Sequence, residues 1–107
     1  QQIQHIEFEN ESKLQTIDEY SFMGASIDYI KIPSKVTHIK KCAFSSEHLH
    51  RIEIPNDSNL QMIEEDAFSH SSIVSITIPS QLTYIGVRAF FCCLQLRRIE
   101  IPIDSKL

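Results

Sequence analysis

Apolar and polar positions alternate in short segments that return at a nearly constant interval along the chain. In one copy, Ile52 and Ile54 share one face of an extended segment, and Arg51 and Glu53 share the other. A proline follows, which lacks an N–H group and therefore ends the strand at a fixed point. The motif I-x-I-P recurs at Ile30–Pro33, Ile52–Pro55, Ile76–Pro79 and Ile99–Pro102, with a degenerate first copy at Ile6–Phe8. The pattern predicts five short strands, each with one buried face.

The spacing between these copies alternates between long and short. Ile6 to Ile30 is 24 residues, Ile30 to Ile52 is 22, Ile52 to Ile76 is 24 and Ile76 to Ile99 is 23. The difference arises in the loop after each strand, where the next apolar residue comes six or four positions later. A period of this size predicts a solenoid in which each turn stacks on its neighbour, here with a two-turn repeating unit.

Two further segments complete each predicted turn. The pattern apolar-x-x-apolar, as in Leu60–Ile63, indicates a short extended segment on an opposite wall. Ala67-Phe68 and its equivalents have room for about one helical or 3₁₀ turn, and we expect the aromatic ring to fill the space between the walls. Successive strands run the same way, so they form a parallel sheet with about 4.8 Å between neighbours.

These elements predict one β-rich repeat domain with a parallel sheet on one face, and short extended segments and single helical or 3₁₀ turns on the others. Its turns span residues 3–26, 27–48, 49–72, 73–95 and, in part, 96–107. Stacked repeats generally need terminal units with a polar outer face, and neither end shows one. We therefore expect either a segment of a longer array or strand edges that pair with another chain.

The order of these motifs over residues 3–107 resembles the BspA-type leucine-rich repeat family, which occurs in surface proteins of mucosal bacteria and parasitic protists. The residues at family positions are Ala43-Phe44, Ala67-Phe68, Ala89-Phe90 and Cys93. The first copy departs from the pattern with Phe8-Glu9 and Ser21-Phe22, and only Gly86 supplies the glycine after the second-wall isoleucine. The resemblance implies a leucine-rich-repeat solenoid at the cell surface or secreted, with a role in adhesion to host proteins or cells.

Composition argues against several other classes of protein. The formal net charge is −4, and the basic pairs Lys40-Lys41 and Arg97-Arg98 are isolated, whereas nucleic-acid binders carry clustered basic surfaces. No apolar stretch reaches the roughly 18 residues of a membrane span, so we expect no membrane insertion of this chain. The polar start Gln1-Gln2 has no signal-peptide character. From these residues we expect neither a signal nor an anchor within residues 1–107.

Candidate chemistry is sparse. His48 and His50 lie on one side of an extended segment, but Glu47 is the only obvious third donor for a metal. The serines that follow each phenylalanine are typical of turns, and two glycines cannot form a phosphate-binding loop. We therefore expect no enzyme, no metal and no cofactor.

The three cysteines, Cys42, Cys92 and Cys93, are odd in number and lack disulfide-framework spacing. We interpret them as small buried residues of the repeat. The alternative is an intermolecular disulfide formed by an exposed Cys92.

The outward face of the sheet offers the most informative surface. Stacking places equivalent residues in two columns, which read His5, Tyr29, Arg51, Ser75, Arg98 and Glu7, Lys31, Glu53, Thr77, Glu100. The charges can simply solvate the sheet and pair across strands, with Lys31 between Glu7 and Glu53. Tyr and Arg are also enriched at contact hot spots. The candidate binding face comprises His5, Tyr29, Lys31, Arg51, Glu53 and Arg98.

The predicted function is a non-catalytic protein-interaction module, with host protein, a second copy or a glycan as partner. The alternative is a structural repeat whose uncapped ends stack into dimers or fibres. Asn10 and Asn56 begin two N-x-S sequences at equivalent loop positions and are candidate glycosylation sites if the protein is secreted. The same sequences also suit a loop that bonds its own backbone.

Overall fold

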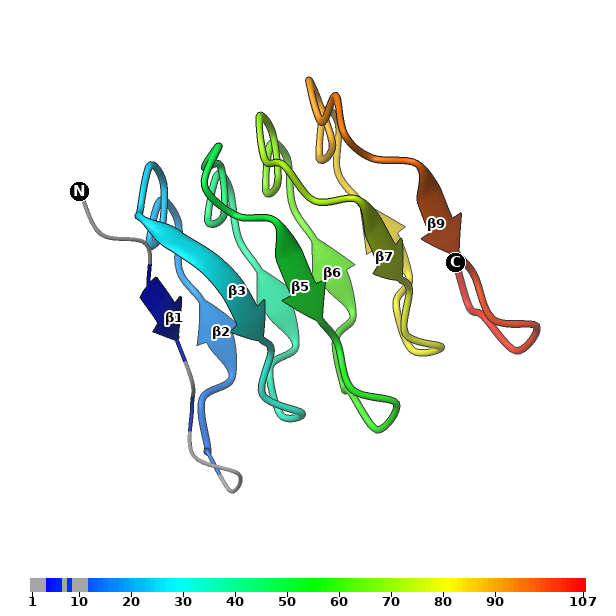
Figure 1. Ribbon diagram of the computed structural model, residues 1–107. Coiled ribbons are helices and arrows are strands. Elements are labelled where there is room, and N and C mark those ends of the chain that lie inside the picture. The colour runs from blue at the N-terminus through cyan, green and yellow to red at the C-terminus, as the bar shows by residue number, and fades with distance from the viewer. Residues whose placement is uncertain (1–3, 7, 9–11) are drawn as a thin grey trace.

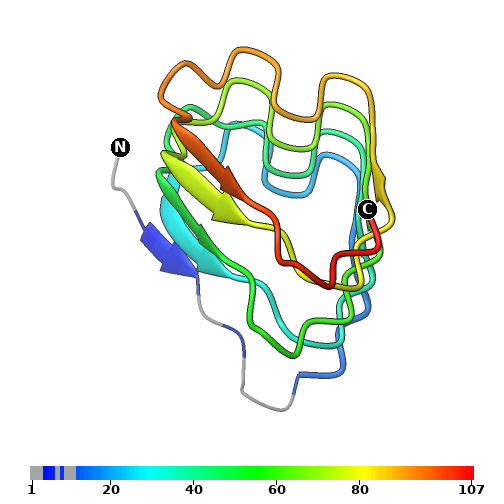
Figure 2. The same ribbon diagram turned by 90° about the vertical axis from the view of Figure 1, so that its right-hand side faces the viewer.

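The computed structural model describes residues 4–6, 8 and 12–107, and within these residues it contains nine short strands and no helix. The strands are β1 Gln4–Ile6, β2 Thr16–Ile17, β3 Ile27–Lys31, β4 His38–Ile39, β5 Arg51–Glu53, β6 Met62–Ile63, β7 Ser75–Thr77, β8 Tyr84–Ile85 and β9 Arg98–Glu100. Odd-numbered strands lie on one wall and even-numbered strands on another, as Figure 1 shows. Seen along its axis in Figure 2, the chain coils around a single interior. The predicted solenoid with a parallel sheet is confirmed.

The first wall carries the I-x-I-P strands. β1, β3 and β5 form a parallel sheet, with His5 opposite Tyr29 and Tyr29 opposite Arg51. β7 and β9 form a second parallel pair, with Ser75 opposite Arg98. The strands therefore run in the predicted direction and register, but they form two sheets rather than one.

The break between β5 and β7 follows the alternation of loop lengths. Ile32 and Ile78, which precede short loops, donate their N–H groups to Glu53 and Glu100 of the next strand, each over 2.8 Å. Ile54 precedes a long loop, and its N–H group has no hydrogen-bond partner among the residues that the structure describes. Ile32 and Ile78 are fully buried, whereas Ile54 is only partly buried. The two-turn unit seen in the sequence is thus a physical division of this wall.

The second wall is continuous. β2, β4, β6 and β8 form a four-stranded parallel sheet in which each strand has two residues. The inward residues Ile17, Ile39 and Ile63 are almost completely buried. The pattern apolar-x-x-apolar therefore marks a real extended segment, as expected.

The third wall differs from the prediction of a helical or 3₁₀ turn, because the described residues form a series of β-turns instead. Some N–H groups close a local turn, such as that of Ser21, which bonds to the Asp18 carbonyl oxygen. The N–H groups between them reach the neighbouring coil, such as that of Phe22, which bonds to the Ala43 carbonyl oxygen. A helix would direct all of these groups along its own axis. Left-handed backbone recurs at equivalent positions, with φ between 55° and 60°, at Tyr20, Cys42, Asp66 and Arg88. The N–H groups of the first three bond to carbonyl oxygens of the next coil.

A column of aromatic rings fills the interior. Phe22, Phe44, Phe68 and Phe90 stack with ring centroids 5.4, 5.5 and 5.7 Å apart and nearly parallel planes. The two middle rings are completely buried. The expectation that this residue fills the space between the walls is confirmed.

Candidate functional site

The outer face of the first wall brings most of the predicted site residues together. Tyr29 lies opposite Arg51, and Lys31 lies opposite Glu53. Arg98 stands on β9, separated from Arg51 by β7 and by the break in the sheet. Only the backbone of His5 is described, and Glu7 of the second column lies outside the described residues.

Charged side chains on this face pair mainly within a strand. Arg51 Nη2 is 3.3 Å from Glu53 Oε1, and Arg98 Nε is 3.1 Å from Glu100 Oε1. The Arg51 guanidinium also lies over the Tyr29 ring, 5.1 Å from its centroid. Lys31 makes no ion pair with a described residue, so the expected pair between Lys31 and Glu53 is absent from the described face. Glu53 pairs with Arg51 rather than with Lys31 because Arg51 and Glu53 project from the same side of one strand.

The sequence-based prediction missed a third column on this face. Arg97 donates its N–H group to the Val74 carbonyl over 2.8 Å, and the side chains of His50, Val74 and Arg97 are all exposed. Strict alternation would have turned these residues inward. The spacing L-x-x-I in Leu49–Ile52 was the available signal, because two apolar residues three apart leave two outward positions between them.

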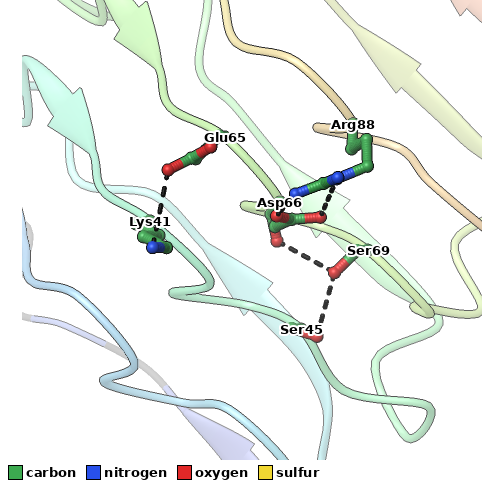
Figure 3. A network of polar contacts seen from close by, with 6 residues as sticks. All are labelled: Lys41, Ser45, Glu65, Asp66, Ser69 and Arg88. Carbon is green, nitrogen blue, oxygen red and sulfur yellow. Dashed lines mark hydrogen bonds and ion pairs between the residues drawn. The ribbon is translucent and has the colours of Figure 1, made fainter.

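A second polar cluster joins neighbouring coils on the third wall and is shown in Figure 3. Lys41 Nζ is 3.5 Å from Glu65 Oε1, and Arg88 Nη2 is 3.2 Å from Asp66 Oδ2. The hydrogen bond from Arg88 to Asp66 raises the pKa of the guanidinium. The charges of Tyr20 and then Glu65 raise the pKa of Lys41. Because every charged group here has a partner in an adjacent coil, the cluster acts as a brace between coils.

The histidine segment does not assemble a metal site. His50 Nδ1 lies 2.7 Å from the His48 carbonyl oxygen, and His48 Nε2 is 3.9 Å from Glu47 Oε1. No group of three or more His, Cys, Asp or Glu side chains that could hold a metal occurs in the described part of the chain.

Serines of the third wall form hydrogen bonds to backbone carbonyl oxygens of the preceding coil. Ser46 Oγ donates to the Ala25 carbonyl and Ser72 Oγ to the Glu47 carbonyl, each over 2.7 Å. Ser69 Oγ contacts both Ser45 Oγ and the Asp66 carbonyl. Their predicted role in turns therefore extends to bonds between coils.

The three cysteines are free, but the expectation that all are buried is wrong. Cys92 is exposed, whereas Cys42 and Cys93 are partly buried. Cys93 Sγ donates to the Phe68 carbonyl over 2.9 Å, which satisfies it within the fold. Cys92 has a φ of 55° and lies in a turn.

The candidate glycosylation loops contain a structural serine. Asn56 is exposed, and Asn10 lies outside the described residues. Ser58 is 3% exposed, and its Oγ accepts the Leu60 N–H over 3.0 Å. Ser105 makes the same bond to Leu107 in a loop without the asparagine. Closure of the loop therefore accounts for the serine independently of modification.

Comparisons with known proteins agree with this architecture. Residues 1–106 match the BspA type leucine-rich repeat region in six copies. No curated protein matches the chain. No helix in the described ranges is long and apolar enough to cross a membrane.

Three solved structures share the fold. The pneumococcal vaccine antigen PcpA is 28% identical with a TM-score of 0.80, over 88% of this chain and 25% of that one. A leucine-rich repeat protein from Bacteroides ovatus is 31% identical with a TM-score of 0.80, over 92% and 25%. A leucine-rich cell surface protein from Faecalibacterium prausnitzii is 25% identical with a TM-score of 0.70, over 86% and 30%.

The chain thus spans about a quarter of the length of PcpA and of the Bacteroides ovatus protein. Leucine-rich repeats generally serve as non-enzymatic binding or scaffold folds, which fits the sparse chemistry of the described residues. On the match over residues 1–106, together with the stacked coils, the chain belongs to the BspA-type leucine-rich repeat family.

Proposed function

We propose that this chain is a non-catalytic protein-interaction module that contacts its partner through the outer face of the first wall. The observation that carries the proposal is the distribution of arginine. Arg51, Arg97 and Arg98 all lie exposed on this face, and the fourth arginine, Arg88, braces two coils elsewhere. Arginine and tyrosine are enriched at contact hot spots, and Arg51 lies over Tyr29 on the same face.

The rigid spacing of the coils supports this role. Backbone hydrogen bonds and the phenylalanine column hold each strand in a fixed place, so outward side chains are presented without a large cost in ordering. The solved cell surface protein from Faecalibacterium prausnitzii shares the fold. We therefore extend the proposal to a location at the cell surface and to adhesion to host proteins or cells.

The test compares two double variants with the same change in net charge. Arg51→Ala with Arg98→Ala removes charge from the proposed face, and Lys13→Ala with Lys35→Ala removes it from exposed positions near the loops. Beads coated with each protein are applied to epithelial cell monolayers and to immobilised extracellular-matrix proteins. We expect the arginine variant alone to lose adhesion. Equal adhesion of both variants would contradict the assignment of the face.

A second candidate function is end-to-end assembly, in which the terminal coil of one copy stacks on that of another. Ile99 and Ile101 are 43% and 57% exposed, whereas their counterparts Ile76 and Ile78 are 2% and 0% exposed. A further coil, or a second copy, can cover such a surface. Light scattering across a wide concentration range tests self-association. Growth in mass that Ile101→Lys abolishes is the expected result, and a constant monomer mass would rule this function out.

A further inference from the structure

The outer face of the first wall has an uncharged strand between two charged ones. The outward side chains of β7 and of the residue that precedes it are Val74, Ser75 and Thr77, which are short and exposed, and we call them the β7 row. The flanking strands carry longer side chains, namely His50, Arg51 and Glu53 beside β5, and Arg97, Arg98 and Glu100 beside β9. Arg51 leans over Tyr29 on β3, away from β7, which leaves the β7 row open.

The flanking charges follow the same order on both sides. Arg51 and Arg98 lie near the start of their strands, and Glu53 and Glu100 lie two residues later. Arg97 adds a further cation at the start and makes no ion pair with any described residue. β7 and β9 are parallel and in register, with Ser75 opposite Arg98 and Thr77 opposite Glu100. Across the break in the sheet, Arg51 and Glu53 follow the same order along β5. The β7 row therefore has a cationic end near Ser75 and an anionic end near Thr77.

This order distinguishes between classes of partner. A uniformly anionic chain, such as a sulfated glycan, would be attracted by the arginines but repelled by Glu53 and Glu100. A uniformly basic segment would meet the opposite conflict. A polypeptide can place an acidic and a basic side chain on one face of an extended segment, two residues and about 7 Å apart. The within-strand ion pairs are exposed, so exchanging them for contacts with a partner costs little.

We propose that the β7 row is the docking site for an extended polypeptide segment that carries an acidic and a basic residue two positions apart. This inference rests on the proposed function of the outer face. The acidic residue contacts the arginines beside Ser75, and the basic residue contacts the glutamates beside Thr77. The small β7 side chains allow the backbone of the segment to approach the sheet face.

Exchanging charges within a strand tests the order without altering composition. Arg98→Glu with Glu100→Arg reverses the order on β9 alone, so the two flanks conflict. Adding Arg51→Glu with Glu53→Arg reverses the order of the arginine and the glutamate on β5 as well. The two flanking strands then have the same charge order again and accept the segment in the opposite direction. Net charge is the same in the wild type and in both variants. Unchanged amide spectra away from the substituted strands confirm that the variants fold.

The probes are short blocked peptides whose centre reads Glu-Thr-Lys, Glu-Thr-Glu or Lys-Thr-Lys, together with heparin. Binding is followed by the amide chemical shifts of residues 74–77 in ¹⁵N-labelled protein. We expect the Glu-Thr-Lys peptide to bind more tightly than the two like-charged peptides. The β9 exchange should weaken the affinity for the Glu-Thr-Lys peptide about fivefold. The combined exchange should restore this affinity to within about twofold of the wild-type value.

Other results would overturn the inference. Equal binding of the three peptides, or no effect of the β9 exchange, would show that charge order is irrelevant. Heparin binding without peptide binding would assign the row to an anionic glycan. Peptide-induced shifts confined to Tyr29 and Lys31 would overturn the β7 site while leaving the proposed function of the face intact.

Discussion

At the residue scale, the two glycines are constrained by different physical causes. A Cβ atom added at Gly86 would lie 2.5 Å from the Glu65 backbone nitrogen, because the neighbouring coil approaches closely there. Gly24 has open space around it, but its φ of 69° lies in the left-handed region. One position is restricted by packing between coils and the other by its own backbone conformation.

We expect Gly86→Ala to lower the free energy of unfolding by about 1 to 3 kcal/mol, because backbone atoms must move to admit the methyl group. Gly24→Ala should cost about 1 to 2 kcal/mol through left-handed strain alone. Urea denaturation measures both values. A crystal structure of each variant separates the causes, since only Gly86→Ala should shift the adjacent coil. Unshifted coils in both variants would contradict the packing argument.

Cys42 gives the fold a dependence on alkaline pH. Burial, and then the negative charge of Asp66, raises the pKa of the Cys42 thiol from its ordinary value of 9.0. The folded state therefore holds this proton more tightly than the unfolded state. Stability from this group is complete below pH 9.0 and falls as the pH rises through that value towards the folded pKa.

The decline in the free energy of unfolding at alkaline pH should be smaller in Cys42→Ala. This variant lacks the thiol but keeps a Cβ atom at the left-handed position. Urea unfolding at about pH 8 and about pH 10 measures the difference for each protein. Cys92→Ala is the matched control, because Cys92 is exposed and also has a positive φ. An identical decline in all three proteins would exclude Cys42 as the source.

At the element scale, the alternation within each strand separates stability from surface chemistry. Ile52 is 8% exposed, whereas its neighbour Glu53 stands on the outer face with its side chain 44% exposed. Ile52→Asp would bury a carboxylate without a partner between coils, so we expect loss of cooperative unfolding. Glu53→Ala should change stability by less than about 0.5 kcal/mol. Thermal unfolding followed by circular dichroism provides the measurement, and similar curves for the two variants would contradict the assigned alternation.

The sequence predicted the elements that depend on side-chain pattern and missed those that depend on backbone hydrogen bonding. The I-x-I-P motif predicted the strands, and the recurring Ala-Phe predicted an aromatic residue that fills the space between the walls; the stacking of the rings came from the structure. The β-turns of the third wall were not foreseen, because left-handed Tyr20, Cys42 and Arg88 are not residue types that favour that conformation. Tyr20 and Cys42 donate their N–H groups to the next coil, and no local sequence signal reports such bonds between coils.

The same limit applies to the candidate site. Tyr29, Arg51 and Glu53 were placed correctly on one face because strand alternation determines their direction. Arg97 and His50 were missed, because an extra outward position precedes each strand and breaks that alternation. Ser75 and Thr77 of the β7 row stood in the predicted columns, whereas Val74 was missed with Arg97 and His50. The break in the sheet beside β7 was also missed, because it depends on how the lengths of loops in neighbouring coils match.

At the scale of the whole molecule, the three walls differ in continuity. The second wall is continuous from β2 to β8 and the phenylalanine column from Phe22 to Phe90, while the first wall divides between β5 and β7. Gly86 donates its N–H group to the Ile63 carbonyl over 2.7 Å, so the same two coils remain bonded on the second wall. The solenoid is therefore held together at its core and second wall, and the division is local to the sheet.

This difference predicts the pattern of amide hydrogen exchange. The Ile54 N–H group lacks a partner among the described residues, so it should exchange at least about tenfold faster than those of Ile32 and Ile78. The Gly86 amide joins the same coils on the opposite wall and should stay protected. Exchange followed by NMR in ²H₂O resolves each amide. If Ile54 exchanged as slowly as Ile32, the first wall would be continuous in solution. If Gly86 exchanged as fast as Ile54, the two coils would separate as units, which the shared core opposes.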